Sequence, residues 1–335
     1  MSIAQPYLLF LGDVTDPISA KTARGIALWR PDLCIGQLRL TPDAVSLGLN
    51  ELTLEQAKHQ GAKSLVIGTA NAGGVIPEAW KGTLIQAAKM GFEIASGMHS
   101  RLTEIPELAQ LQQQSRTKLH DVRHYDESLS VGNGIARQGK RILTVGTDCS
   151  VGKMFTALAL EKALQEIEVD ARFKATGQTG ILVAGEGISI DAVVADFISG
   201  AVEAISSAFD DHDWDIIEGQ GSLFNPSFAG VSLGLLHGAQ ADALVLCHEV
   251  NRPHIRHLPH CKMPSITATI EANLAAARLT NPKAQLAGIS LNTSALDERE
   301  AKNLCATWQE EFNVPVTDPV RFGIDAIADH LVTHF

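Results

Sequence analysis

The chain has 335 residues, of which 45% are hydrophobic and 19% charged, and its formal net charge is −11. This length favours two domains, and the lack of any long apolar run argues against a membrane-spanning segment. No secretory leader pattern is present, and the five cysteines form no Cys-x-x-Cys pair, so the sequence predicts reduced thiols in a cytoplasmic protein.

The charge is unevenly divided along the chain. Residues 1–137 carry 13 basic and 13 acidic side chains, whereas residues 138–335 carry 14 basic and 25 acidic ones. An acidic half of this kind does not suit sequence-independent nucleic-acid binding. We therefore expect a small-molecule ligand, with neither nucleic acid nor membrane as a partner.

Residues 1–137 alternate short apolar strands with helical segments. The strands are expected at 7–11, 33–40, 64–67 and 92–95, and the helices at 22–28, 54–60 and 83–90. This alternation predicts a parallel, Rossmann-like sheet. The glycine-rich turns at 68–74 and 97 follow strands, where such sheets bind ligands, although tight turns alone would also explain these glycines.

Residues 110–140 are polar, and we place the domain boundary near 137. The second half again predicts an open parallel sheet. The strands are expected at 141–146, 171–175, 214–217, 243–248, 265–268 and 286–291, and the helices at 153–167, 190–207 and 301–312. The sequence thus predicts an α/β protein with domains 1–137 and 138–335.

The most informative segment joins the strand at 141–146 to the helix at 153–167. It consists of Gly146, Thr147, Asp148, Cys149, Ser150, Val151, Gly152, Lys153 and Met154. A strand, a glycine-flanked loop and a Gly-Lys pair at a helix start are typical of a phosphate-binding loop, in which backbone N–H groups and a lysine surround an anion. We therefore predict a P-loop NTPase-like C-terminal domain.

The loop departs from the commonest pattern in two ways. Five residues, not four, separate Gly146 from Gly152, and Met154 replaces the hydroxyl residue that usually contacts magnesium. A thioether is a poor ligand for this cation. The spacing resembles the variant loop of the dethiobiotin synthetase and cobyric acid synthase class, in which Gly-Thr-Asp opens the same turn.

Two charged residues end strands beside this loop. Glu218 follows an apolar strand and precedes Gly-Gln-Gly, so it could hold magnesium or its water shell; an acid matches this place in the dethiobiotin synthetase class. Lys174 ends the strand at 171–175, where the same class has a lysine near phosphates and substrate, and a surface lysine is the alternative.

Further candidates lie in loops. Gln178 and Thr179, in a loop of small residues, could approach a substrate. Asp196 is preferred to Asp191 on the expected helix at 190–207, because its apolar neighbours would make an unpaired carboxylate costly. Asn292 ends a strand where related nucleotide enzymes read the adenine edge; otherwise it is a turn former.

Histidines and cysteines crowd into one segment. It contains Cys247, His248, His254, His257, His260 and Cys261. Zinc is one interpretation, but two prolines interrupt the segment and no established ligand spacing is present. The other is a loop with one base-like or substrate-facing histidine, for which we choose His254.

Four motifs together resemble one family across nearly the whole chain. They are Gly-Thr-Asp-Cys-Ser-Val-Gly-Lys-Met, Ala-Thr-Gly-Gln-Thr-Gly-Ile, Ile-Asp-Ala-Val-Val-Ala-Asp-Phe-Ile-Ser-Gly and Glu-Gly-Gln-Gly-Ser-Leu. The chain resembles the D-glutamate N-acetyltransferase-like (DgcN-type) family, formerly labelled a domain of unknown function. The resemblance implies a Rossmann-like domain before a P-loop domain and transfer of acetyl from acetyl-CoA to the amine of D-glutamate.

Under that interpretation the loop binds the phosphates of acetyl-CoA without a magnesium-bound hydroxyl, and Glu218 or His254 is the base. An alternative is an ATP- and magnesium-dependent enzyme that activates a carboxylate, with Glu218 at the metal. A third is a non-catalytic nucleotide-dependent sensor or assembly factor. Related P-loop enzymes also lead us to expect a homo-oligomer.

Overall fold

A computed structural model of the chain describes residues 2–17, 19–69, 74–125 and 128–335. It contains two compact units. Unit 1 comprises Met1–Asp126 and Gly177–Ala192, and unit 2 comprises Glu127–Thr176 and Val193–Phe335. Within the described ranges, every helix is too short or too polar to cross a lipid bilayer.

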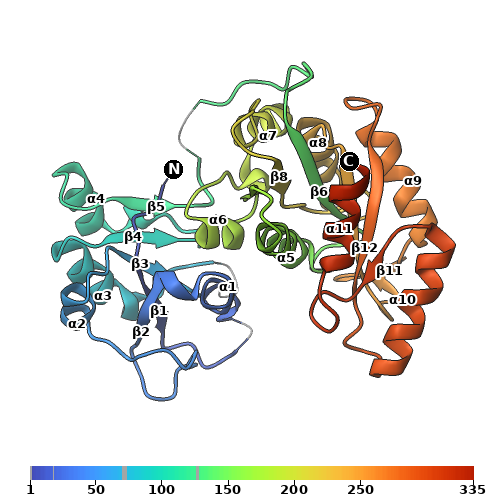
Figure 1. The fold of residues 1–335 in the computed structure, drawn as a ribbon. Helices are drawn as coiled ribbons and strands as arrows, with labels where there is room; N and C mark the ends of the chain where they lie inside the picture. Colours follow the sequence, from blue (N-terminus) through green and yellow to red (C-terminus); the bar gives the residue numbers. More distant parts are fainter. Residues whose placement is uncertain (1, 18, 70–73, 126–127) are drawn as a thin grey trace. The chain divides into compact units, whose positions relative to one another are not determined.

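Unit 1 contains a five-stranded sheet in the order β2-β1-β3-β4-β5, and all its neighbouring strands are parallel (Figure 1). Its strands are β1 (Tyr7–Gly12), β2 (Cys34–Arg39), β3 (Ser64–Ile67), β4 (Glu93–Ser96) and β5 (Leu119–Asp121). Its helices are α1 (Lys21–Trp29), α2 (Leu54–His59), α3 (Glu78–Lys89), α4 (Pro106–Gln113) and α6 (Gln178–Ala184). Every residue of β1 is buried, as expected for a strand covered on both faces.

The end of β1 shows how the sequence fixes local structure in unit 1. Trp80 of α3 packs edge-on against Phe10, with ring centroids 5.3 Å apart, and its Nε1 donates to Asp13 Oδ1 at 2.8 Å. Gly12 lies between them with φ +58°, and a Cβ there would come within 2.3 Å of the indole. Only glycine satisfies both the dihedral angle and the close approach.

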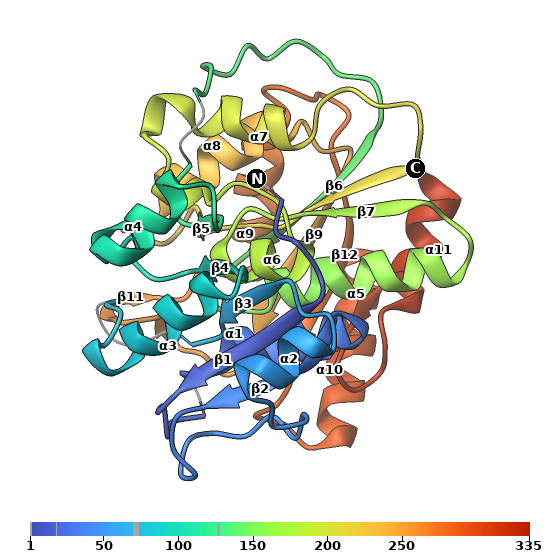
Figure 2. The same cartoon turned by 90° about the vertical axis from the view of Figure 1, so that its left-hand side faces the viewer.

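Unit 2 contains a six-stranded sheet in the order β13-β12-β9-β6-β8-β7, again with parallel neighbours (Figure 2). Its strands are β6 (Lys140–Gly146), β7 (Ala171–Lys174), β8 (Trp214–Ile217), β9 (Ala243–Glu249), β12 (Gln285–Asn292) and β13 (Val316–Thr317), and β10 (His254–Ile255) forms a separate hairpin with β11 (Leu258–Lys262). Its helices are α5 (Lys153–Glu166), α7 (Ile198–Ile205), α8 (Ala229–Ala239), α9 (Ile266–Ala277), α10 (Glu298–Phe312) and α11 (Asp325–His334). Because β6 lies between β8 and β9, the segments that follow these three strands meet at one edge of the sheet.

The α/β class with two parallel sheets is confirmed, but two expected elements are wrong. Residues 190–207 are two 3₁₀ turns followed by α7, because Val194, with φ −57° and ψ 136°, leaves the helical conformation and interrupts the helix. Asp191 and Asp196 therefore do not share one helix. Residues 265–268 are not a strand: Ser265 accepts a hydrogen bond from Ala268 N at 3.2 Å and caps the start of α9.

The segment 177–192 leaves the P-loop half of the sequence and joins unit 1. There α6 packs against α1, and the N–H of Ile3 donates to the carbonyl of Gly185 at 2.9 Å. The compact units therefore do not follow a single cut near residue 137. Within the glycine-rich turn expected at 68–74, residues 70–73 lie outside the described residues.

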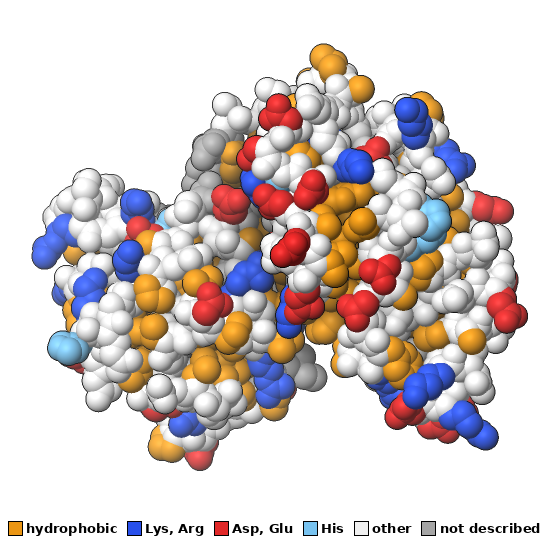
Figure 3. All heavy atoms as spheres, in the orientation of Figure 1, with side chains coloured by type: hydrophobic (Ala, Val, Ile, Leu, Met, Phe, Trp, Pro, Cys, Tyr) orange, Lys and Arg blue, Asp and Glu red, His pale blue; other side chains and the backbone are white. Residues whose placement is uncertain are grey.

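Acidic side chains are prominent on unit 2. On the face drawn in Figure 3, Asp and Glu side chains are spread over this unit among fewer Lys and Arg. This distribution agrees with the excess of acidic residues after residue 137.

Candidate functional site

The loop between β6 and α5 has the form of a phosphate-binding loop. Gly146 ends the strand, and Gly152 precedes the helix with φ +106°. Lys153 is buried and its Nζ donates to the carbonyl of Asp148 at 2.8 Å, so the ammonium lies over the loop. Burial lowers the pKa of this lysine. A positive group held against the loop at a helix N-terminus favours an anion there.

Asp148 holds the loop together from inside. Its fully buried carboxylate accepts hydrogen bonds from Asn225 Nδ2 at 2.9 Å, Arg252 Nη1 at 3.1 Å and Arg256 N at 2.7 Å. Burial by itself would raise the pKa of Asp148, but these donors keep the pKa below its ordinary value. Through these bonds the Asp148 carboxylate connects the loop to Asn225, Arg252 and Arg256 and so stabilises the loop conformation.

Arg252 is a component of this site that the sequence analysis missed. Besides Asp148, its guanidinium donates to the carbonyls of Cys149 at 2.8 Å and Ser150 at 3.2 Å, and it pairs with Glu249. Several donors in one rigid plane suit this role. In the sequence, Arg252 is recognisable only as a residue that follows an apolar strand. That position does not reveal that β9 pairs with β6, which is what brings Arg252 to the loop.

Glu218 follows β8 and lies close enough to Lys153 for the two charges to interact. Glu218 is 3% exposed, and its Oε2 accepts from Thr176 N at 3.0 Å. The next residue, Gly219, donates to Thr144 Oγ1 at 2.9 Å, and a Cβ on it would lie 2.9 Å from Lys153 Cδ. The strand end after β8 therefore packs directly on the lysine.

Lys174 has a different environment. Its Nζ lies 3.3 Å from Asp215 Oδ1, and Asp215 also bonds His212 Nε2 at 2.8 Å and Ser206 Oγ at 2.6 Å. The lysine is thus part of a mostly buried polar network. A role for Lys174 at phosphates or substrate stays a prediction.

The histidine segment contributes one ring to the loop. His248 Nδ1 lies 3.0 Å from Thr147 Oγ1, and burial, with Arg252 nearby, lowers the pKa of His248 to about 4. His254, our choice from the sequence, lies in β10 of the hairpin with β11, and its role as a base stays a prediction. Among the described residues, no group of three or more His, Cys, Asp or Glu side chains is arranged to hold a metal ion.

A cavity of about 400 Å³ adjoins the loop and the start of α5. Its walls combine apolar side chains with a few polar groups, a lining typical of ligand sites. They come from Val151, Gly152, Phe155, Thr156, Ser290, Leu291, Asn292, Ser294, Asp318, Pro319, Val320 and Arg321. Asn292 accepts from Ser294 N at 3.1 Å through Oδ1, which leaves its amide N–H groups as potential donors.

The three predicted substrate residues are divided between the units. Gln178 and Thr179 begin α6 in unit 1, where Gln178 Oε1 accepts from Arg123 Nη1 at 2.9 Å. Asp196 lies in unit 2 and is exposed, so the cost of burial does not apply to it. Its role as a substrate residue stays a prediction.

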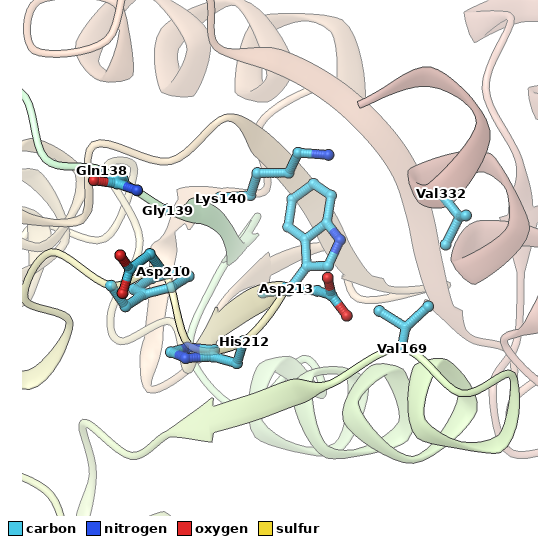
Figure 4. A pocket seen from close by; sticks show the side chains of 10 residues that line it. Gln138, Gly139, Lys140, Val169, Asp210, His212, Asp213 and Val332 are labelled. Carbon is cyan, nitrogen blue, oxygen red and sulfur yellow. The ribbon is translucent and has the colours of Figure 1, made fainter.

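A second cavity, of about 430 Å³, opens at the opposite, amino edge of the unit 2 sheet (Figure 4). Lys140 and Trp214, the first residues of β6 and β8, form part of its wall with His212 and Asp213. Because it lies at the other end of these strands, it does not belong to the loop site.

Comparison with known proteins agrees with this architecture. Residues 40–125 match the Rossmann-like domain of unknown function DUF1611_N, and residues 130–328 match the P-loop domain DUF1611_C. A crystal structure of a DUF1611 family protein from Anabaena variabilis is 32% identical, with a TM-score of 0.84 over 99% of this chain and 100% of that one.

Two curated relatives are similar over their full lengths. One from a Pseudoalteromonas species is 51% identical over 99% of this chain and 100% of its own, and one from Tritonibacter scottomollicae is 47% identical over 98% and 99%. Both are named D-glutamate N-acetyltransferase. By its two domains, its fold and these relatives, the chain belongs to the DUF1611 family.

Proposed function

We propose that the protein is an N-acetyltransferase that moves acetyl from acetyl-CoA to the amine of an amino acid, D-glutamate in the first instance. The observation that carries this proposal is the full-length similarity, at 51% and 47% identity, to two proteins named D-glutamate N-acetyltransferase. A fold alone would not support a particular chemistry.

The residues of unit 2 suit such a donor. The N–H groups of residues 146–152 and the ammonium of Lys153 would hold the pyrophosphate of CoA, and the adjoining cavity would receive its adenine, with Asn292 at the base edge. CoA needs no magnesium bridge to the protein, and Met154 offers no hydroxyl for one. Both features favour CoA over magnesium-bound ATP.

The transfer forms a bond between the amine nitrogen and the acetyl carbon and breaks the bond from that carbon to the CoA sulfur. A base of the chain must first take one proton from the substrate ammonium, so that the free amine can attack, and the oxyanion that develops must be stabilised. The nitrogen loses its second proton as the intermediate collapses, and this proton converts the departing CoA thiolate into the thiol. Glu218 is our first candidate for the base, since it lies beside Lys153, and His254 is the second. Backbone N–H groups in residues 219–222 are the proposed oxyanion donors.

Calorimetric titration tests the donor. Acetyl-CoA, and separately ATP with magnesium, are titrated into the wild type, Lys153→Ala and Lys162→Ala. Lys162 is on the same helix but exposed and paired with Glu166, so it is the matched control. We expect acetyl-CoA binding that is lost only in Lys153→Ala. Binding of magnesium-ATP without acetyl-CoA would instead support the carboxylate-activating alternative, in which Glu218 is near the metal.

Release of CoA thiol in the presence of D-glutamate tests the activity. Glu218→Gln and His254→Gln are each expected to bind acetyl-CoA, and the base should be the one whose loss reduces kcat by about a hundredfold or more. Unchanged transfer in the double variant would reject both. Tight binding without any product would favour a nucleotide-dependent sensor. A cytoplasmic location and a homo-oligomer stay predictions; light scattering of the purified protein tests the latter.

A further inference from the structure

The carboxyl edge of the unit 1 sheet, which is a different sheet from the one that holds the phosphate loop, has the topology of a ligand site. In the order β2-β1-β3-β4-β5, the chain runs outward from β1 to β2 on one side and from β3 to β5 on the other. The strand order therefore reverses between β1 and β3. In open parallel sheets, ligands bind beyond the carboxyl ends of the strands at such a reversal.

Three threonines lie on elements that adjoin this edge, in α1, just after β3 and in α6. Thr69, just after β3, is 3% exposed, and its Oγ1 has no hydrogen-bond partner among the described residues. The preceding Gly68 packs so closely on the first turn of α1 that a Cβ there would lie 2.3 Å from Ala23 Cβ. A buried hydroxyl without a partner costs free energy unless a ligand or water completes its bond.

A pair of hydroxyls joins α1 to α6. Thr22 Oγ1 and Thr179 Oγ1 lie 3.4 Å apart, and either can donate to the other. Each hydroxyl carries one hydrogen, and their mutual bond uses only one. One hydroxyl hydrogen of the pair therefore remains for a ligand.

Arg123 fixes the direction of the Gln178 amide. Arg123 Nη1 lies 2.9 Å from Gln178 Oε1, and Nη2 lies 3.0 Å from Asp191 Oδ2. Because a guanidinium can only donate, the Gln178 oxygen must face it, and the Gln178 NH₂ group must point elsewhere as a donor. A Cβ on Gly97, just after β4, would lie 3.4 Å from that oxygen, so the amide sits at the same strand edge.

The site thus offers neutral donors from three parts of unit 1: α1, the end of β3 and α6. The charge of Arg123 is already balanced by Asp191, which leaves it to orient Gln178. Several neutral donors on elements that adjoin one strand edge are suited to one carboxylate, since each bond to a charged acceptor is stronger than a neutral one.

We propose that this edge of unit 1 binds a carboxylate of the acceptor amino acid through the Gln178 amide and the hydroxyls of Thr22, Thr69 and Thr179. The proposal rests on the proposed function for the identity of the acceptor. Arg123 is a positioning residue in it.

Steady-state kinetics with D-glutamate, paired with calorimetry for acetyl-CoA, test the site. Gln178→Glu keeps the size of the side chain but replaces a donor by an anion, so the KM for D-glutamate should rise by about a hundredfold or more, as expected for loss of a charge-assisted bond plus repulsion. The Kd for acetyl-CoA should stay within twofold. Gln113→Glu, on the exposed end of α4, is the matched control and should change neither.

Thr22→Val and Arg123→Lys test the same site from other elements. Thr22→Val retains the shape and removes a hydroxyl, and we expect the KM for D-glutamate to rise about tenfold. Arg123→Lys retains the charge but loses the planar fork, so it should raise KM while kcat changes little. If Gln178→Glu also lowers the melting temperature or the affinity for acetyl-CoA, its KM no longer tests the site, and the KM of Thr22→Val for D-glutamate decides whether the site binds the acceptor.

The outcomes separate the two proposals. Acetyl transfer by the wild type with unchanged KM in Gln178→Glu and Thr22→Val would overturn the site and leave the proposed function standing. If the wild type transfers no acetyl group to D-glutamate, the proposed function fails, and direct calorimetric titration with D-glutamate decides the site. Binding that Gln178→Glu abolishes would support it, whereas absent or unaltered binding would overturn it.

Discussion

Arg252 Nη1 donates to Asp148 Oδ2 across 3.1 Å, and so connects the end of β9 to the inside of the phosphate loop. The same guanidinium donates to two carbonyls of that loop. The loop conformation is thus held by a side chain from a neighbouring strand as well as by its own glycines. An anion site built in advance binds its ligand at a smaller entropic cost.

Removing this arginine should weaken both stability and ligand binding. Arg252→Ala removes one charged donor from the buried Asp148, and we expect a loss of about 2–3 kcal/mol in the free energy of unfolding, the scale of a hydrogen bond to a charged group. Urea denaturation measures this change. Arg256→Ala is the control, because Arg256 contacts Asp148 only through its backbone N–H and its side chain is exposed. Equal stability of the two variants would show that the guanidinium does not support the loop.

The Asp148 carboxylate should contribute to acid sensitivity. Its folded pKa is lowered, so the charged form stabilises the fold above the unfolded pKa of about 4, and this stability is lost as the pH falls through the folded pKa. The unfolding free energy of Asp148→Asn should therefore fall less steeply than that of the wild type between about pH 5 and pH 3. Urea unfolding across this range measures it. Asp43→Asn, at an exposed position, should retain the wild-type slope.

His248 should remain neutral at physiological pH. Burial lowers its pKa to about 4, so its ring should titrate near pH 4 in NMR spectra, well below the ordinary value of about 6.5. Because the unfolded ring takes up a proton first, this residue lowers stability as the pH falls from the unfolded pKa towards the folded one. A ring titration near pH 6.5 would mean that His248 is not enclosed beside Thr147.

Gly219 should not tolerate a side chain. A Cβ there would lie 1.7 Å from the carbonyl oxygen of Thr144 and 2.9 Å from Lys153 Cδ, so Gly219→Ala must displace β6 or the lysine. We expect a loss of at least about 1–3 kcal/mol, as for overpacking of a core, together with weaker acetyl-CoA binding.

Gly230→Ala provides the contrast. Gly230 is in α8, where an added Cβ has no neighbour within 4 Å. This substitution should stabilise the protein by about 0.5–1 kcal/mol, the difference between glycine and alanine in a helix. Thermal unfolding compares the two variants, and destabilisation of similar size in both would contradict the close packing of Gly219.

The sequence predicted those features that depend on local patterns. Apolar strands such as β3 and β8, and the strand–loop–helix around Lys153, are each recognisable within about 15 residues because their signals are periodicity and turn chemistry. The strand at 265–268 failed because Ile266 and the two threonines after it are also strand formers, and the cap at Ser265 decided the outcome.

Contacts distant in the sequence were not predictable in the same way. Arg252 reaches the loop only because β9 neighbours β6, and Gln178 meets Arg123 only because α6 joins unit 1. Neither adjacency leaves a pattern in a single sequence. We chose Asp196 because its apolar neighbours suggested that the expected helix would bury its carboxylate. That helix does not form over residues 190–197, and Asp196 is exposed.

Residues 177–192 belong to unit 1 but lie within the sequence of unit 2, and this limits where the chain can be cut to give stable fragments. The chain passes from one unit to the other after Asp126, after Thr176 and after Ala192. A fragment that begins at residue 138 would carry α6 without α1, and so expose Ile181, Leu182 and Val183, which are buried in the intact protein. We expect such a fragment to aggregate. A single proteolytic cut at one of the three crossings should leave the two units covalently connected through the other two crossings.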